Sequence, residues 1–475
     1  MSDAQNDMKT VARFFCCPVL VGFLGLALLA RGAPAQPAAG TNGPSKGAPL
    51  RLAIVSAEPS ALPVLDLLTV ELSRTPGIQL LERAEIDRVY REQGLSAVNR
   101  DYLKLGQVLG ANGLVLLTPV AEGTNRFLQA RLVAVGPGVV IAYVRAPLPV
   151  PEPAQWAQRT ARHFEPLLPK LSVLAKDAIP LSIVNLRSAV RSAEAEELER
   201  QLTPLAAERL SRERELFVLE RQRMELLTSE KELREGSEAA FWNGGYLLDG
   251  VVDRDGYSKD TVTVSARLLP PKGGAPIAIE ISGSRTNLSE VLNRLTDKVR
   301  QGLKLGAQQA AWDPAEEAAR YFEEAKWAFK WGMLGEAQSA CESSWALGRK
   351  TKEVAELRIR IYGAEGTAPD TDWLSTTPTS PAYAPNPALL EPAIHALELY
   401  MQGFRTFLNT EPKPDTNWYA LGVQLLSSQL LRRFNYFPER CQGHEERLAV
   451  LRSLSRDTLG MLRDQKQYAG LAPLV

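Results

Sequence analysis

Short apolar runs and helically spaced leucines alternate along the chain from residue 50 onward. The run from Leu52 to Val55 has a β-branched end and predicts a buried strand. Leu65, Leu68 and Leu72 follow at helical spacing, so they predict a helix with one apolar face. Thr75-Pro76-Gly77 ends this helix. The opening pattern is therefore a strand followed by a helix.

The alternation of strands and helices continues to about residue 168. Residues 78–81 predict a second strand, and a helix then ends before Gly94. A short helix over residues 102–109 and an apolar strand over residues 114–117 come next. Two further strands and a closing helix over residues 153–168 complete the order β-α-β-α-α-β-β-β-α. This order predicts an α/β sheet with helices packed on it.

One part of this pattern occurs twice. Two tripeptides recur 138 positions later, from Leu72-Ser73-Arg74 and Leu81-Glu82-Arg83 to Leu210-Ser211-Arg212 and Leu219-Glu220-Arg221. A second closing helix is expected over residues 288–305. A repeat of this kind predicts tandem domains of one fold. Its two copies account for most of the folded mass without any catalytic site.

Alternating apolar residues mark a strand in each copy. Leu128, Ala130 and Leu132 alternate in the first copy. Val264, Ala266 and Leu268 are their counterparts in the second copy, 136 positions later. An alternation with a period of two predicts antiparallel strands with one covered face. The predicted domains are residues 50–172 and, in a more diverged form, residues 177–306.

Three features of the repeats resemble functional motifs, and each has a simpler structural interpretation. Glu82 and Glu220 begin a helix, where the helix dipole favours an acid, and no His or second acid lies nearby in sequence. Gly110 to Gly113 follows a helix and precedes a strand, the reverse of a phosphate loop. Asp253 to Gly256 lacks the Glu of a calcium loop and favours a hairpin turn. No catalytic, cofactor-binding or metal-binding residue is predicted.

The motifs of the first copy resemble the CsgG-like domain family of curli-secretion proteins. They are Leu80-Leu81-Glu82-Arg83, Glu92-Gln93 and the segment from Leu105 to Ala111, and the resemblance covers about 120 residues. The second copy keeps Leu219-Glu220-Arg221 and Glu230 but lacks the third motif. The resemblance implies a non-enzymatic, exported envelope domain that serves secretion or assembly at the outer membrane or adapts to periplasmic machinery. Family pores use an acylated N-terminal cysteine and long amphipathic strand insertions, and neither is recognisable here.

The first residues have the pattern of an export signal. Lys9 and Arg13 precede an apolar run over residues 14–30, and small residues follow at positions 33–35. We expect a signal peptide over residues 1–35, with a retained membrane anchor as the alternative. The expected location is therefore the periplasm or the outer-membrane-bounded envelope.

The cysteines do not indicate a lipoprotein. Cys16 and Cys17 lie at the start of the apolar run, whereas a lipidated cysteine follows it. Cys341 and Cys441 remain after cleavage, either paired or each buried singly. Residues 36–49 are rich in Pro, Ala and Gly and predict a flexible leader.

The pattern changes to helices after residue 313. Large and small residues over residues 313–365 resemble a tetratricopeptide unit. A Pro-rich linker is expected over residues 366–387, and an all-α helical region over residues 388–475. Four tryptophans are assigned to core packing, with a peptide-binding groove as the alternative: Trp327, Trp331, Trp345 and Trp418. Cys441 and His444 have a metal-like spacing but no second pair nearby.

Charge and motif content narrow the function classes. Lys plus Arg and Asp plus Glu are both 55, so no overall field favours nucleic acid or an anionic membrane. No Walker loop, Gly-x-Ser-x-Gly elbow, His-Glu-x-x-His helix or Cys-x-x-Cys pair is present. We therefore expect a non-enzymatic envelope scaffold, without a cofactor, that binds other envelope proteins. An outer-membrane pore subunit and an enzyme without a known motif are the alternatives. Homo-oligomerisation and peripheral outer-membrane association stay open.

Overall fold

The computed structural model describes residues 49–56, 58–93, 102–190, 193–219, 245–306 and 311–366, together with single positions beyond residue 400. The predicted signal peptide, the Pro-rich linker and most of the C-terminal helical region lie outside the described residues. Among the described helices, none is both long enough and apolar enough to cross a membrane.

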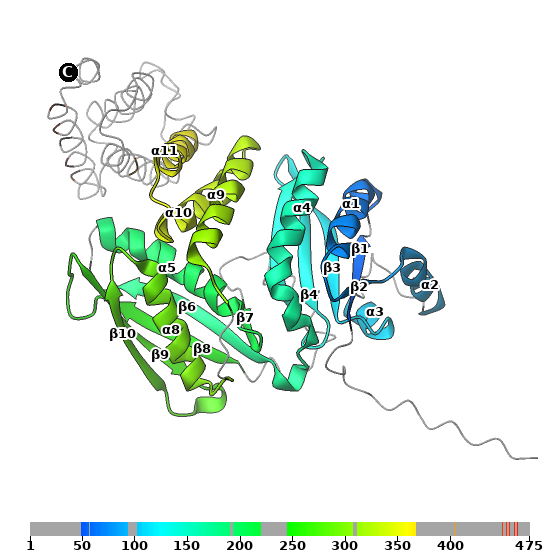
Figure 1. Cartoon of the computed structure of the whole chain (residues 1–475), viewed down its shortest axis with the longest axis horizontal. Coiled ribbons are helices and arrows are strands. Elements are labelled where there is room, and N and C mark those ends of the chain that lie inside the picture. The colour runs from blue at the N-terminus through cyan, green and yellow to red at the C-terminus, as the bar shows by residue number, and fades with distance from the viewer. Residues whose placement is uncertain are drawn as a thin grey trace, which may run out of the picture. The chain divides into compact units, whose positions relative to one another are not determined.

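The first α/β unit is built on a five-stranded mixed sheet (Figure 1). Its strands are β1 (Leu50–Ser56), β2 (Ile78–Leu80), β3 (Gly113–Glu122), β4 (Asn125–Ala134) and β5 (Val139–Pro147). They lie in the order β2-β1-β3-β4-β5. β1 is parallel to β2 and β3, whereas β4 is antiparallel to β3 and β5. β2 and β5 are therefore the edge strands.

Helices cover both faces of this sheet. They are α1 (Leu62–Ser73), α2 (Arg83–Gln93), α3 (Tyr102–Val108) and α4 (Pro153–Phe164), with short 3-10 turns at Pro59–Ala61, Glu165–Ser172 (η2) and Ala175–Asp177. α1 and α4 pack on one face, and α2 and α3 pack on the other (Figure 1).

The side-chain alternation of β1 explains the two covered faces. Leu52 and Ile54 belong to the core under α1 and α4, while Ala53 and Val55 belong to the core under α2 and α3. The predicted apolar face of the first helix is confirmed, because Leu65, Leu68 and Leu72 are all buried. The prediction of a single covered face is wrong for the first unit. Strand residues such as Val133 and Val140 pack with α3 on the second face.

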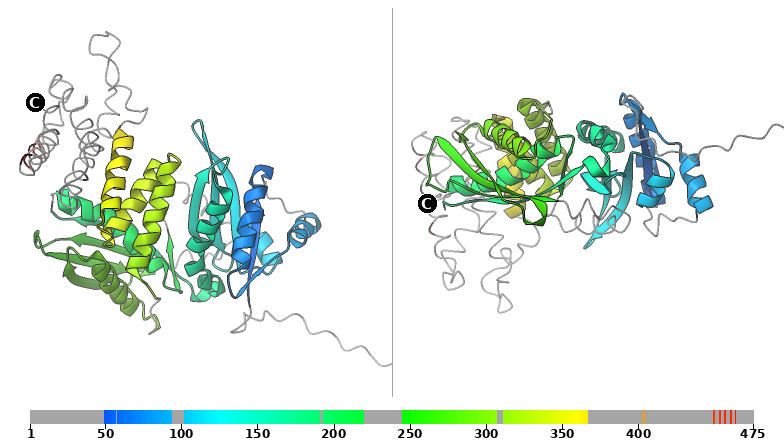
Figure 2. Two further views of the ribbon diagram at one scale, coloured as in Figure 1. Left: turned by 45° about the horizontal axis from the view of Figure 1, so that its top comes forward. Right: turned by 90° about the horizontal axis from the view of Figure 1, so that it is seen from below.

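The second α/β unit has a sheet of the same topology. Its strands are β6 (Ile179–Ser188), β7 (Leu216–Leu219), β8 (Tyr246–Val252), β9 (Thr261–Leu269) and β10 (Ile277–Ser284). The order β7-β6-β8-β9-β10 matches β2-β1-β3-β4-β5, and each strand direction matches as well. Helices α5 (Ala193–Ser211) and α8 (Leu288–Gly302) pack on one face (Figure 2).

The strand registers also agree between the two units. Leu132 pairs with Val115 in the first sheet, and Leu268, which lies 136 positions after Leu132, pairs with Leu248 in the second. The fold class of mixed sheets with helices packed on them is thus confirmed. The domain boundaries themselves stay predictions.

Over residues 311–366, three helices follow the second unit: α9 (Pro314–Lys330), α10 (Leu334–Ala346) and α11 (Lys352–Gly366). Asp313 caps α9, because its side chain accepts hydrogen bonds from the backbone N–H groups of Ala315 and Glu316. Gly332 has a φ of 72°, which lets the chain reverse between α9 and α10. Trp327 and Trp345 are buried, as core packing predicts.

A buried ion-pair network attaches α10 and α11 to the second unit. The Arg358 guanidinium donates to both Glu342 carboxylate oxygens at 2.7 Å and to Glu197 of α5 at 2.9 Å. Gln201 of α5 also donates to Glu342, at 2.9 Å. The guanidinium lies 4.7 Å from the ring centre of Trp345. Burial of these charged groups costs free energy of desolvation. The bidentate hydrogen bonds between Arg358 and Glu342 offset that cost.

Lys170 of η2 joins the first unit to the second. Its amine donates to the carbonyl oxygens of Glu213, at 2.5 Å, and Leu216, in the turn between α5 and β7. It also lies 4.9 Å from the ring centre of Phe217, and the side chain is 2% exposed. Burial lowers the pKa of Lys170 to about 7, although Glu213 and Glu215 act in the opposite direction.

The junction at Lys170 predicts a pH-dependent stability. An unfolded lysine has a pKa of about 10.4, so unfolding takes up a proton between about pH 7 and pH 10. The free energy of unfolding should therefore rise with pH in this window, by at most about 1.4 kcal/mol per pH unit. Lys170→Met removes the titrating group and this rise. Urea denaturation at pH 7 and pH 9 measures the free energy of unfolding of the unaltered protein and of Lys170→Met. If the two proteins differ by the same free energy at both pH values, the assignment is contradicted.

Candidate functional site

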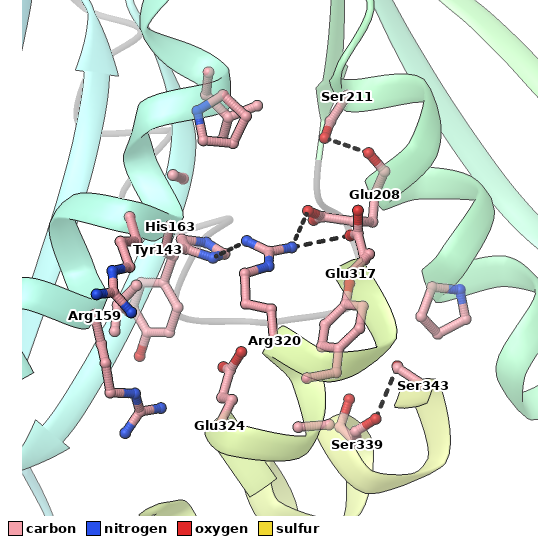
Figure 3. A pocket seen from close by; sticks show the side chains of 18 of the residues that line it. Tyr143, Arg159, His163, Glu208, Ser211, Glu317, Arg320, Glu324, Ser339 and Ser343 are labelled. Carbon is pink, nitrogen blue, oxygen red and sulfur yellow. Dashed lines mark hydrogen bonds and ion pairs between the residues drawn. The ribbon is translucent and has the colours of Figure 1, made fainter. Parts of the chain in front are cut away.

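A cavity of about 1450 Å³ lies between the two α/β units and the helices α9 and α10 (Figure 3). β5, α4 and η2 of the first unit line one side. α5 and β7 of the second unit, with α9 and α10, line the other side. We call this cavity the cleft. It is the candidate functional site because three parts of the fold contribute to it.

The edge of β5 lines the cleft. All six consecutive residues from Val140 to Arg145 contribute to the lining. Because successive side chains of a strand point to opposite faces, a strand that contributes every residue presents its edge. β7, the edge strand of the second sheet, contributes Val218 and Leu219 and is in contact with β5. The two edge strands belong to separate sheets.

Arg320 of α9 is the centre of a charge network in the cleft (Figure 3). Its guanidinium donates to Glu317 at 2.9 Å and to Glu208 of α5 at 3.3 Å. It also lies 3.2 Å from Nδ1 of His163 of α4. Helices that are far apart in sequence are thereby bridged by one side chain.

Arg212 and Trp312 complete the pairing of Glu317. Arg212, directly after α5, lies 2.6 Å from the Glu317 carboxylate, and the Trp312 indole N–H donates to the same oxygen at 2.8 Å. Glu317 is 4% exposed, so its charge needs these partners. Burial raises the pKa of the Glu208 carboxyl, but the guanidinium groups of Arg320 and Arg212 outweigh burial and hold that pKa below its usual range. Glu208 is therefore an ionised member of a paired network.

His163 is held neutral in this network. Burial lowers the pKa of the imidazole, and the nearby Arg320 charge lowers it further. A guanidinium has no acceptor, so Nδ1 accepts the hydrogen bond from Arg320 and the ring proton lies on Nε2. Burial also raises the pKa of the Tyr321 phenol, and Glu208 adds to this effect. At neutral pH these groups hold their protons in fixed states.

Arg159 and Glu324 are further charged residues of the cleft lining. Arg159 of α4 stacks on Trp327 of α9, with 4.6 Å between the guanidinium carbon and the ring centre. Glu324 of α9 lies beyond this stack, and no ion pair or hydrogen bond joins its carboxylate to another described side chain (Figure 3). Burial lowers the pKa of Arg159, and the charge of Glu324 acts in the opposite direction.

Two more ion pairs connect the first unit to the helices beyond the second. Arg145, near the end of β5, pairs with Glu336 of α10 and with Glu122 at 2.6 Å. Lys330 of α9 lies 2.5 Å from Glu152, which precedes α4. The Lys330 pair is exposed and contributes little free energy, whereas the Arg145 pairs are more buried.

The motif-like residues of the sequence do not meet in the cleft. Glu82 is exposed beside the start of α2, and Glu220 lies outside the described residues, as do Cys441 and His444. Asp253 to Gly256 forms a turn between β8 and β9, with a hydrogen bond from the Gly256 N–H to the Asp253 carbonyl at 3.1 Å. The Asp253 carboxylate is buried and lies 2.6 Å from Arg285, a partner that sequence reasoning missed.

Cys341 is a free thiol in the interior. It is 1% exposed, and burial raises the pKa of its thiol above the ordinary value. Its candidate partner Cys441 lies outside the described residues. Within the described ranges, no group of three His, Cys, Asp or Glu side chains is placed to bind a metal ion.

Comparison with known proteins does not add to this picture. No protein-family model matches the chain, and a search of functionally curated proteins finds no match either. The cleft must therefore be interpreted from its own geometry.

The Arg320 network predicts how His163 titrates. Arg320→Gln removes a cation beside the imidazole, so the pKa of His163 should rise, while burial keeps it below the ordinary value of about 6.5. Lys330→Gln removes an exposed cation from the same helix and should leave the pKa of His163 unchanged. NMR titration of the imidazole Cε1–H signal measures both variants. An unchanged pKa in Arg320→Gln would show that Arg320 does not contact His163 in solution.

Proposed function

We propose that the protein is a non-enzymatic interaction scaffold of the bacterial cell envelope, an accessory of an outer-membrane secretion or assembly system. The observation that carries this proposal is the cleft, where two units of one topology and a helical pair contribute walls of paired charges. Its acids Glu208 and Glu317 are neutralised by Arg320 and Arg212, and its histidine is neutral. Paired groups of this kind stabilise a binding surface.

The family resemblance fits this proposal. In each unit a parallel strand pair is followed by an antiparallel meander and a closing helix, in the order that the CsgG-like motifs imply. We assign both units to this domain type, the second in diverged form. The export signal and the periplasmic location belong to the same proposal.

The helical pair supports a tetratricopeptide-like assignment for residues 313–365. α9 and α10 are joined by a short turn at Gly332, and small buried residues such as Ala325 and Ala337 lie where the helices pack. Gly403 lies close to Tyr362 of α11, since a Cβ at Gly403 would be 3.1 Å from that ring. This contact fits a stack that continues beyond α11, as such repeats require for stability.

The proposal predicts that partner capture depends on the cleft. Ser339 of α10 lines the cleft, and Ser339→Arg would place a long cation in it (Figure 3). Val70→Arg is the control, because Val70 is 49% exposed on α1 and does not line the cleft. Affinity purification from a periplasmic fraction should return an exported envelope protein with the unaltered chain and with Val70→Arg, but about tenfold less with Ser339→Arg.

Two results would contradict the proposal. One is that no envelope protein is captured by the unaltered chain. The other is that Ser339→Arg captures the same partner as strongly as Val70→Arg does, with both variants folded by circular dichroism. In the second case the partner binds elsewhere on the chain.

A further inference from the structure

Polar contacts between described residues join the first unit to α9 and α10 across the cleft. His163 of α4 accepts a hydrogen bond from Arg320 at 3.2 Å. One turn earlier on α4, Arg159 stacks on Trp327. The further contacts are the pairs of Lys330 with Glu152 and of Arg145 with Glu336. α4 and α9 are not closely packed, because the cleft lies between them, so these contacts decide how firmly the cleft is closed.

His163 is the member of these contacts that changes its charge near neutral pH. Histidine is the side chain whose ordinary pKa lies between pH 5 and pH 8, whereas arginine, lysine and glutamate ordinarily keep their charges there. The imidazole is half-buried and lines the cleft, so protons reach it from the solvent. The chain has two other histidines, His395 and His444, and both lie outside the described residues.

A protonated His163 does not fit the contact with Arg320 (Figure 3). A guanidinium has only donors, so the contact needs the lone pair on Nδ1 of the imidazole. Protonation places an N–H on Nδ1, opposite the N–H of the guanidinium, and sets two cations side by side. The hydrogen bond between α4 and α9 is then replaced by repulsion.

The charged groups around His163 act in both directions. Burial lowers the pKa of the imidazole, Arg320 and Arg212 lower it as well, and Glu208 and Glu324 raise it. The two acids do not prevail, since Glu208 is paired with Arg320 and the net direction is downward. The remaining titratable groups that line the cleft on the surrounding elements are Tyr143 of β5, Arg159, Arg162 and Glu165 of α4 and η2, and Glu317 and Tyr321 of α9. The closed cleft therefore favours the neutral imidazole.

We propose that protonation of His163 releases α4 from α9 and opens the cleft at acid pH. This inference goes beyond the proposed scaffold function and does not depend on it, because it concerns the shape of the isolated chain. α9 stays with the second unit when α4 leaves, since Arg212 still pairs with Glu317 and Arg320 with Glu208. The Lys170 junction between the two units lies outside the cleft lining and serves as the hinge.

The direction of the pH effect follows from the two states of the imidazole. In the open cleft His163 is exposed and has the ordinary pKa of about 6.5, whereas in the closed cleft its pKa lies lower. The open form therefore binds more protons, so the closed form is favoured above about pH 6.5 and is lost as the pH falls. The ratio of open to closed form rises by at most about tenfold per pH unit. Lys170, with a pKa of about 7, carries its charge over most of this range.

Hydroxyl-radical footprinting of the full chain at pH 7.5 and pH 5 measures the opening. Trp327 lines the cleft and is 7% exposed, whereas Trp345 is also 7% exposed but does not line the cleft. Oxidation of Trp327 relative to Trp345 should rise at least about threefold at pH 5, because the release uncovers the face of Trp327 on which Arg159 stacks. An equal ratio at both pH values overturns the inference.

Two variants separate His163 from other effects of pH. In His163→Asn the amide oxygen accepts from Arg320 in place of Nδ1 without titrating, so the ratio should be the same at pH 7.5 and pH 5. Lys330→Gln is the control, because it removes an exposed cation from α9 and should keep the full acid response. An acid response in His163→Asn as large as in the unaltered chain shows that another group is responsible and overturns the assignment to His163.

Arg320→Gln tests the same contact from the other helix. Its amide oxygen accepts a hydrogen bond from the protonated imidazole, so the ratio should no longer depend on pH. This variant decides the question if His163→Asn fails to fold by circular dichroism, and a full acid response in it overturns the inference. Partner capture at neutral pH does not enter any of these measurements, so the scaffold proposal stands or fails separately.

Discussion

The structure depends on the burial of one edge of the second sheet against the first unit. Phe217 and Leu219 of β7 belong to the same apolar core as α1 and α4. Burial of such side chains contributes about 1.5 to 3 kcal/mol each. The turn before β7 would leave carbonyl groups without partners, and Lys170 supplies the donors from the first unit. Beside it, Glu213 lies between Arg209 and Arg300, so the charges at this junction are paired.

This junction determines where the cleft lies. Once β7 is held against the first unit, β5 lies next to it, and α5 is placed opposite α4. α9 and α10 then close the remaining side through Arg320 and the Arg145 pair with Glu336. The two sheets are separate, and their edge strands β5 and β7 both line the cleft. The two units therefore form a cleft that neither of them lines alone.

Much of the fold could be predicted from the sequence. The repeat at 138 positions and the alternation of Leu128, Ala130 and Leu132 predicted matching strands, and both sheets have the same order and direction. These signals are local: they come from periodicity within a helix or strand. The second covered face of the first sheet was not predicted. Val133 and Val140 belong to its core, on the side that the alternation assigned to solvent.

The site could not be predicted in the same way. Arg320 lies 157 positions from His163 and 112 from Glu208, so no spacing along the chain indicates that they meet. The burial of Lys170 and Asp253 could not be predicted from the sequence either. The local pattern does not distinguish a buried charged residue from an exposed one. The hydrophobic periodicity of the sequence predicts which apolar side chains are buried. It does not predict which charged side chains the packing brings together. The local signals were the helical spacings of Glu208 with Arg212 and of Glu317 with Arg320.

Hydrogen–deuterium exchange of the β7 amides tests most directly whether the second sheet is held against the first unit through Lys170. The account predicts that the amides from Leu216 to Leu219 exchange slowly in the unaltered protein and faster in Lys170→Met, whereas the amides of the central strand β4 exchange slowly in both proteins. Equal exchange of the β7 amides in the two proteins would contradict the account.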